Sequence, residues 1–141
     1  MARVVSAQRV IAAPAQDIFD VLKDPSRHRE IDGTGEVGAP RGTSSTLSLG
    51  ATFAMHMRHV VPYVTVNRVV EFDEPRRIAW HHAARFVWRY ALEPVEGGTL
   101  VTESFDYSVP WGVALGALGV PARNRRAMER TLARLEAVVT S

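Results

Sequence analysis

The order of the predicted elements indicates an α+β fold, in which a curved antiparallel sheet of about seven strands wraps around a long C-terminal helix. Three observations predict this arrangement. Bulky apolar side chains alternate with polar ones through much of residues 51–109, as they do in half-buried strands. Short turns that contain glycine or proline separate these strands, and short turns join antiparallel neighbours. After Pro110 the apolar residues recur at helical spacing.

The chain begins with one predicted strand and one predicted helix. Residues Val4–Ile11 are rich in β-branched side chains, which favour strands, and Ala13-Pro14 ends this strand. Pro14 suits the first turn of a helix, where a backbone N–H has no partner to lose. The apolar face of this helix, which extends to about Lys23, consists of Ile18, Phe19, Val21 and Leu22.

A second short helix and a loop-rich stretch are predicted next. Asp24-Pro25-Ser26 stops the first helix and starts the second, which extends through Arg29. Residues 33–50 are rich in glycine, serine and threonine, which indicates loop. Within this loop we expect a short strand around Glu36-Val37 and the start of another at Leu47-Ser48-Leu49.

The rest of the sheet is predicted to be a meander. Five strands are expected at residues 52–60, 63–73, 77–83, 86–94 and 100–109. Glu74-Pro75-Arg76 and Glu96-Gly97-Gly98 supply turns between them. Strands that follow one another through such short turns pair antiparallel with their neighbours in sequence.

The C-terminal part is predicted to be helical. A short helix is expected at residues 111–118, and Gly119 separates it from a long last helix that Pro121 suits as a start. The apolar face of the last helix is formed by Met128, Leu132, Leu135 and Val139. One curved sheet can wrap around this amphipathic helix, so we expect one domain over residues 1–141.

Composition excludes several classes of chemistry. The 141 residues contain no cysteine, so disulfides, thiolate metal sites and cysteine nucleophiles are absent. We expect a cytoplasmic protein without a membrane span, because the longest weakly polar run, residues 109–122, is too short to cross a bilayer. Basic side chains cluster on the last helix at Arg123, Arg125, Arg126, Arg130 and Arg134. They are interpreted as a solvated helix face, and no nucleic-acid partner is expected.

Local motifs along the chain carry a resemblance to a known family. The matching segments are residues 11–15, 18–22, 24–25, 50–53, 69–72, 75–80 and 98–102. Together with the element order, they resemble the START-like superfamily, also called helix-grip or Bet v 1-like. The chain looks most like the bacterial polyketide cyclase/dehydrase and lipid-transport domains of that superfamily. This resemblance implies a hydrophobic cavity between the sheet and the last helix.

The candidate ligand-binding residues come mostly from the face of the strands that should point inward. They are Phe53, Met55, Met57, Asn67, Trp80, His82, Trp88, Tyr90, Glu103, Phe105, Tyr107, Trp111, Met128 and Leu132. Glu103 lies between two apolar residues of the same parity, and a buried carboxylate needs a partner or a raised pKa. Candidate partners are His82, Tyr90, Asn67 or an arginine, and the alternative is a shifted register that exposes Glu103. Glu103 and His82 are also the candidate catalytic residues.

Three other motifs are given structural interpretations. Residues 33–38 spell G-x-G-x-x-G, but no strand precedes them and no helix follows, so we expect a flexible loop rather than a dinucleotide site. Asp32 is interpreted as a turn residue. The histidine pairs His56/His59 and His81/His82 alternate between strand faces, so no metal site is expected, and no cofactor is expected either.

Three functions remain open from the sequence. The first is a carrier or binding protein for a small hydrophobic molecule such as a lipid, polyketide or isoprenoid. The second is a polyketide aromatase/cyclase or dehydratase that moves protons with cavity residues, although no convincing acid and base pair is present. The third is an interaction module, for example a toxin–antitoxin component. A homodimer is compatible with each of them.

Overall fold

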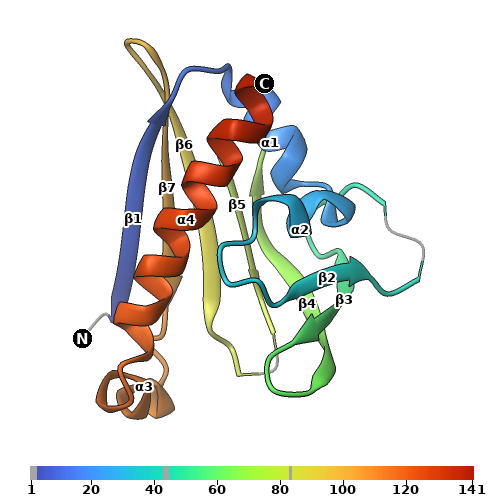
Figure 1. Cartoon of the computed structure of the whole chain (residues 1–141), viewed down its shortest axis with the longest axis vertical. Coiled ribbons are helices and arrows are strands. Elements are labelled where there is room, and N and C mark those ends of the chain that lie inside the picture. Colours follow the sequence, from blue (N-terminus) through green and yellow to red (C-terminus); the bar gives the residue numbers. More distant parts are fainter. Residues whose placement is uncertain (1–2, 43–44, 83) are drawn as a thin grey trace.

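Seven strands in the described part of the chain form one antiparallel sheet that curves around the last helix (Figure 1). This computed structural model describes residues 3–42, 45–82 and 84–141. The strands are β1 (Val4–Ile11), β2 (Val37–Pro40), β3 (Thr52–Arg58), β4 (Pro62–Asp73), β5 (Arg77–His81), β6 (Val87–Val95) and β7 (Gly98–Asp106). Their order across the sheet is β1-β7-β6-β5-β4-β3-β2, so every neighbour except β1–β7 is consecutive in sequence.

The helices lie on one face of this sheet. They are α1 (Ala15–Leu22), α2 (His28–Ile31), α3 (Val113–Ala117) and α4 (Val120–Thr140), with short 3-10 helices η1 (Pro25–Arg27) and η2 (Pro110–Gly112). In Figure 1, α4 crosses in front of β1 and β7, while α1 and α2 lie beside it. Since the first two helices and the last helix share this face, the sheet and helices enclose a common interior.

The predicted fold class is confirmed, and so are the meander and the two short helices after the first strand. One predicted strand is wrong. Leu47 lies in an irregular segment. Its backbone N–H donates to the carbonyl oxygen of Lys23 at 2.7 Å and not to a neighbouring strand. Leu47 is buried, so its apolar character reflects packing against the core beside α1. The following residues turn, since the N–H of Ala51 donates to the carbonyl oxygen of Ser48.

Several predicted boundaries shift. β7 ends at Asp106 rather than at residue 109, because the Asp106 carboxylate accepts the N–H of Ser108 and starts a turn. β5 ends at His81, and the predicted end at Ala83 lies outside the described residues. The short second helix is η1 followed by α2, and Asp24 caps η1 by accepting the N–H of Ser26 at 3.0 Å.

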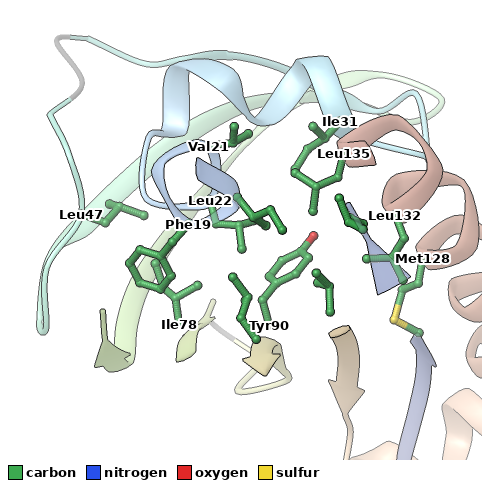
Figure 2. Close-up of a cluster of buried hydrophobic side chains, with 14 of the residues drawn as sticks. Phe19, Val21, Leu22, Ile31, Leu47, Ile78, Tyr90, Met128, Leu132 and Leu135 are labelled. Atoms are coloured by element: carbon green, nitrogen blue, oxygen red, sulfur yellow. The ribbon is translucent and has the colours of Figure 1, made fainter. Parts of the chain in front are cut away.

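The core fills the space between the sheet and the helices (Figure 2). Its largest fully buried side chains include Ile18 and Phe19 of α1, Ile78 of β5, and Leu132 and Leu135 of α4. Each such side chain contributes about 1.5–3 kcal/mol when it leaves water. The spacing of α4 places its apolar residues on the face toward the sheet, which fixes that helix across the interior.

Candidate ligand-binding cavity

The core is not completely filled. A cavity of about 270 Å³ lies between the inner face of the sheet, α2 and α4. The sheet contributes eight of the residues that were predicted to contact a ligand, and the residue directly after β5, His82, is the ninth. The eight are Phe53, Met55, Met57, Asn67, Trp80, Trp88, Tyr90 and Glu103. α4 contributes Met128, the tenth. The strand alternation therefore brings these side chains to one wall, although contact with a ligand stays a prediction.

Four predicted residues lie elsewhere. Phe105 is buried beside the cavity wall, with its ring centroid 4.7 Å from that of Trp88, and Tyr107 stacks on Phe105 at 5.7 Å. Leu132 is a core residue of α4. Trp111 is about half exposed, and its indole N–H donates to the carbonyl oxygen of Ala84 at 2.8 Å, which joins η2 to the β5–β6 loop.

An aromatic cluster forms one end of the cavity wall. The ring of His28 stacks on Trp80 with centroids 5.2 Å apart, and the edge of Phe53 meets both rings at 5.5–5.7 Å. The ring of Trp80 also packs against that of Tyr90, with the ring centroids 5.9 Å apart. Rings in such tilted and stacked arrangements bury a large apolar area and attract one another, so these side chains form one packed cluster.

His28 was missed by the sequence analysis. It is buried, and its Nε2–H donates to the carbonyl oxygen of Leu22 at 2.8 Å. Burial lowers the pKa of His28, so the ring is neutral at pH 7. The sequence gives only a weak indication that His28 is buried. α2 has four residues, and the one apolar residue on the same helix face as His28 is Ile31.

Glu103 is the buried acid of the cavity. It points inward from β7 and is 4% exposed, so the predicted inward parity of this strand is confirmed. Of the four predicted partners, the structure selects Tyr90, whose hydroxyl donates to Glu103 Oε2 at 3.0 Å. Figure 2 shows Tyr90 on the sheet among residues of α1 and α4, with its hydroxyl directed away from the strands. Glu103 Oε1 has no hydrogen-bond partner within the described residues.

The environment of Glu103 keeps this carboxyl group protonated at neutral pH. Burial raises its pKa to about 8, and the hydrogen bond from Tyr90 opposes the shift only in part. Burial likewise raises the pKa of Tyr90 well above its usual value, so the phenol keeps its proton and remains the donor. The pair is therefore an uncharged acid beside an uncharged phenol.

The loop after α2 forms the rim of the cavity and is held in place by its own hydrogen bonds. Asp32 accepts the N–H groups of Thr34, Glu36 and Val37 at 3.0 Å each, which confirms its interpretation as a turn residue. The expectation of a flexible glycine loop is wrong for its first residue. Gly33 packs so closely on α4 that an added Cβ would lie 2.2 Å from the carbonyl oxygen of Ala127.

α4 fastens this loop through three side chains. Thr131 Oγ1 accepts the N–H of Gly33 at 2.8 Å, and Arg130 Nε donates to the carbonyl oxygen of Gly33 at 2.9 Å. Arg134 donates to the carbonyl oxygen of Asp32 at 2.6 Å. Two arginines of the cluster on the last helix thus have a structural function at the rim, which the sequence interpretation of a solvated face missed.

The remaining histidines do not assemble a metal site in the described part of the chain. His56 is exposed on β3, and His59 Nδ1 lies 2.5 Å from Glu36 Oε1 in a hydrogen bond at the surface. His82 lines the cavity near Phe86, and burial lowers its pKa. Residues 3–42, 45–82 and 84–141 contain no group of three or more potential metal ligands.

The structure adds cavity residues that were not among the sequence candidates. They are mostly small or polar residues of the rim and of α4: His28, Ile31, Asp32, Thr34, Glu36, Val37, Tyr63, Thr65, Asn124, Ala127 and Thr131. The alternation of β4 could have identified Tyr63 and Thr65, because they share parity with Asn67. Asn124, Ala127 and Thr131 of α4 lie close to the core residues Met128 and Leu132 on the same helix. In the sequence they are indistinguishable from other residues that flank the apolar face of a helix.

A seven-stranded antiparallel sheet curved around a long C-terminal helix defines a helix-grip, Bet v 1-like domain. The profile of the family described as Polyketide cyclase / dehydrase and lipid transport matches residues 2–140, and the chain belongs to this family. The resemblance stated from the sequence motifs is thereby confirmed.

The curated relatives come from Mycobacterium tuberculosis. The chain is 33% identical over 138 residues to "Uncharacterized protein Rv0088" of strain ATCC 25618 / H37Rv, and the match covers 93% of this chain and 62% of that protein. "Uncharacterized protein MT0096" of strain CDC 1551 / Oshkosh is 32% identical with the same coverage. The chain thus spans less than two thirds of the length of both relatives.

Solved structures share the fold at low sequence identity. Protein NE0264 from Nitrosomonas europaea superposes with a TM-score of 0.76 at 16% identity, covering 97% of this chain and 94% of its own. The KanY protein gives 0.78 at 13% identity, with 100% and 99% coverage. These similarities support the fold alone. None of the helices in the described part of the chain has the length and hydrophobicity that crossing a bilayer requires.

Proposed function

We propose that this protein binds a small hydrophobic molecule, such as a lipid, polyketide or isoprenoid-like compound, in the cavity between the sheet and α4. The supporting observation is the cavity wall itself, which combines rigid aromatic rings with Met55, Met57 and Met128. Apolar burial supplies the affinity in such a site, and a few polar groups orient the ligand. Methionine adapts its shape to different ligands.

The size of the cavity limits the ligand. A dry cavity of about 150 Å³ holds one benzene molecule. The cavity of about 270 Å³ is less than twice as large, so it suits a compound with one or two rings or one short chain. A lipid with two long acyl chains exceeds this volume unless α4 or the rim moves. We therefore propose a carrier or binding protein for compact ligands.

Binding of a neutral fluorescent probe tests this function. N,N-dimethyl-1-naphthylamine, an uncharged two-ring probe, should bind with one site per chain and brighten as it leaves water. Ala127→Phe places a ring in the cavity from the buried face of α4 and should weaken probe binding at least tenfold. Ala133→Phe adds the same ring on the exposed face of α4 and is the matched control.

Thermal denaturation of both variants separates loss of the cavity from loss of the fold. The proposal is rejected if the unmodified chain shows no saturable probe binding. It is also rejected if folded Ala127→Phe binds the probe as tightly as Ala133→Phe does. Native mass spectrometry of protein from its own host identifies the natural ligand by its mass.

One observation also favours a second function, a cyclase or dehydratase. Glu103 is a buried acid that is protonated at neutral pH, and such a group can donate a proton to a reacting carbonyl. Catalysis would require Glu103→Gln to abolish turnover of a β-keto substrate while probe binding remains. Full turnover in that variant would remove the catalytic role and leave the binding function intact.

A further inference from the structure

The free oxygen of Glu103 defines what kind of polar group the cavity accepts. Oε1 is buried, lies on a residue of the cavity wall and has no partner within the described residues. Nearly all buried polar atoms in folded proteins have a hydrogen-bond partner. Oε2 already accepts the Tyr90 hydroxyl at 3.0 Å, so the partner of Oε1 has to come from the contents of the cavity.

The hydrogen bond from Tyr90 also fixes where the acid proton lies. The Tyr90 O–H donates to Oε2, and the carbonyl oxygen is the stronger acceptor of a protonated carboxyl group, so we assign the proton of Glu103 to Oε1. A protonated carboxyl oxygen is a donor, and it requires an acceptor opposite it. A bound molecule that places an oxygen lone pair there completes the hydrogen bonding of this wall.

The charges that line the cavity disfavour anionic ligands, because Asp32 and Glu36 line it together with Glu103. Asp32, on the loop after α2, is engaged by three backbone N–H groups, and the histidines that line the cavity, His28 and His82, have lowered pKa values. The residues that α4 adds to the wall are uncharged, and β1 places Ala7 opposite Glu103. The described lining residues include no lysine or arginine. A ligand carboxylate would therefore enter without a cation to pair with.

We propose that the cavity selects uncharged ligands that carry a carbonyl oxygen, as in a ketone, ester or lactone, and that Glu103 Oε1–H donates a hydrogen bond to that oxygen. This inference rests on the proposed binding function and assigns its polar specificity. The aromatic cluster of His28, Phe53 and Trp80 covers the apolar part of the ligand. A cationic amine is the competing ligand, because it would pair with ionised Glu103 instead.

Four naphthalene probes of nearly equal size test the selectivity by quenching of tryptophan fluorescence at pH 7. They are 2-acetylnaphthalene, 2-ethylnaphthalene, 2-naphthoate and 1-(2-naphthyl)ethylamine. The ketone should bind roughly tenfold more tightly than the hydrocarbon, as one buried hydrogen bond allows. The carboxylate and the ammonium ion should both bind more weakly than the hydrocarbon, because the site must desolvate their charge.

The pH profile of the unmodified chain tests the role of the proton. Affinity for the ketone should be constant up to about pH 7 and should fall toward tenfold per pH unit above pH 8, since ionised Glu103 is no longer a donor. Affinity for the hydrocarbon should change much less. Glu103→Gln supplies an amide donor at every pH, so it should keep the ketone preference and lose this pH dependence. Glu103→Leu should bind both probes equally.

The outcomes separate this inference from the function on which it rests. Failure of both the ketone and the hydrocarbon to bind would reject hydrophobic binding and the inference together. Binding of the hydrocarbon without preference for the ketone would reject the inference alone. Tightest binding of the amine, lost in Glu103→Gln, would show that Glu103 acts as an anion and would overturn the assignment.

Discussion

The ionisation of one buried carboxyl group, that of Glu103, should make the folded state less stable as pH rises. The folded chain holds the pKa of Glu103 at about 8, compared with an ordinary value of 4.5. Between these two values the folded state binds more protons than the unfolded state, so stability falls as pH rises and levels off above about pH 8. Glu103→Gln is neutral at every pH and can still accept the Tyr90 hydroxyl.

The size of the effect follows from the pKa difference. Each pKa unit corresponds to about 1.4 kcal/mol, so the raised pKa of Glu103 costs the fold about 2 kcal/mol at pH 6 and about 5 kcal/mol at pH 9. The stability advantage of Glu103→Gln over the unmodified chain should therefore grow by about 3 kcal/mol between pH 6 and pH 9.

Urea denaturation followed by tryptophan fluorescence at pH 6, 7, 8 and 9 measures this difference. Comparing the variant with the unmodified chain at each pH cancels the titration of all other groups. Glu93→Gln, at an exposed position of β6, is the control and should track the unmodified chain. A constant difference between Glu103→Gln and the unmodified chain across this range would show that Glu103 ionises normally, and the reasoning from burial would then be refuted.

Three further predictions concern the rim and the aromatic wall. Gly33→Ala should destabilise the fold by about 1–3 kcal/mol in urea, because its Cβ would overlap the carbonyl oxygen of Ala127. Gly116→Ala, with open space around it, should change the urea midpoint little. Thr131→Val should cost about 1–3 kcal/mol by leaving the Gly33 N–H unpaired, whereas Thr131→Ser should not, and equal midpoints for both would contradict the role of the hydroxyl. Burial lowers the pKa of His28, so the contribution of its neutral ring to stability is present above pH ~6.5 and is lost as pH falls. The urea midpoints at pH 5 and pH 7.5 should therefore differ less in His28→Gln than in the unmodified chain.

The sequence predicted the fold because its strongest patterns agree with one another. Strand alternation placed Val101, Glu103 and Phe105 on one face, and all three are buried there. The apolar spacing of the last helix placed Met128 and Leu132 toward the sheet, and both are buried. Such periodic patterns can be recognised in the sequence alone, because each strand or helix repeats its pattern several times.

The pairing of Glu103 with Tyr90 could have been predicted from the sequence, but the sequence analysis left several candidate partners open. Val95 pairs with Gly98 across the β6–β7 turn, and counting back along both strands brings Tyr90 opposite Glu103. Applying the hairpin register would have chosen this partner over His82 and Asn67. The registry of a hairpin is a local property, so this step needed no knowledge of the rest of the fold.

Other features depend on contacts between distant segments. α2 is one turn long, so His28 had no periodic pattern to mark it as buried. Leu47 looked like the start of a strand, but its backbone bonds to Lys23, which no local pattern reveals. The close approach of Gly33 to α4 joins residues about one hundred positions apart, and only the assembled fold brings them together.

The two ends of the sheet differ in what they offer to another polypeptide. β2 has four residues and includes Pro40, which lacks the N–H that a neighbouring strand would need. β1 has eight residues in unbroken register with β7, and no strand of residues 3–42, 45–82 and 84–141 pairs with its other side. A regular row of free backbone groups can template a further strand, whereas a short edge with proline resists it. Any strand that is added, from a second copy or from another chain, should therefore lengthen the sheet next to β1.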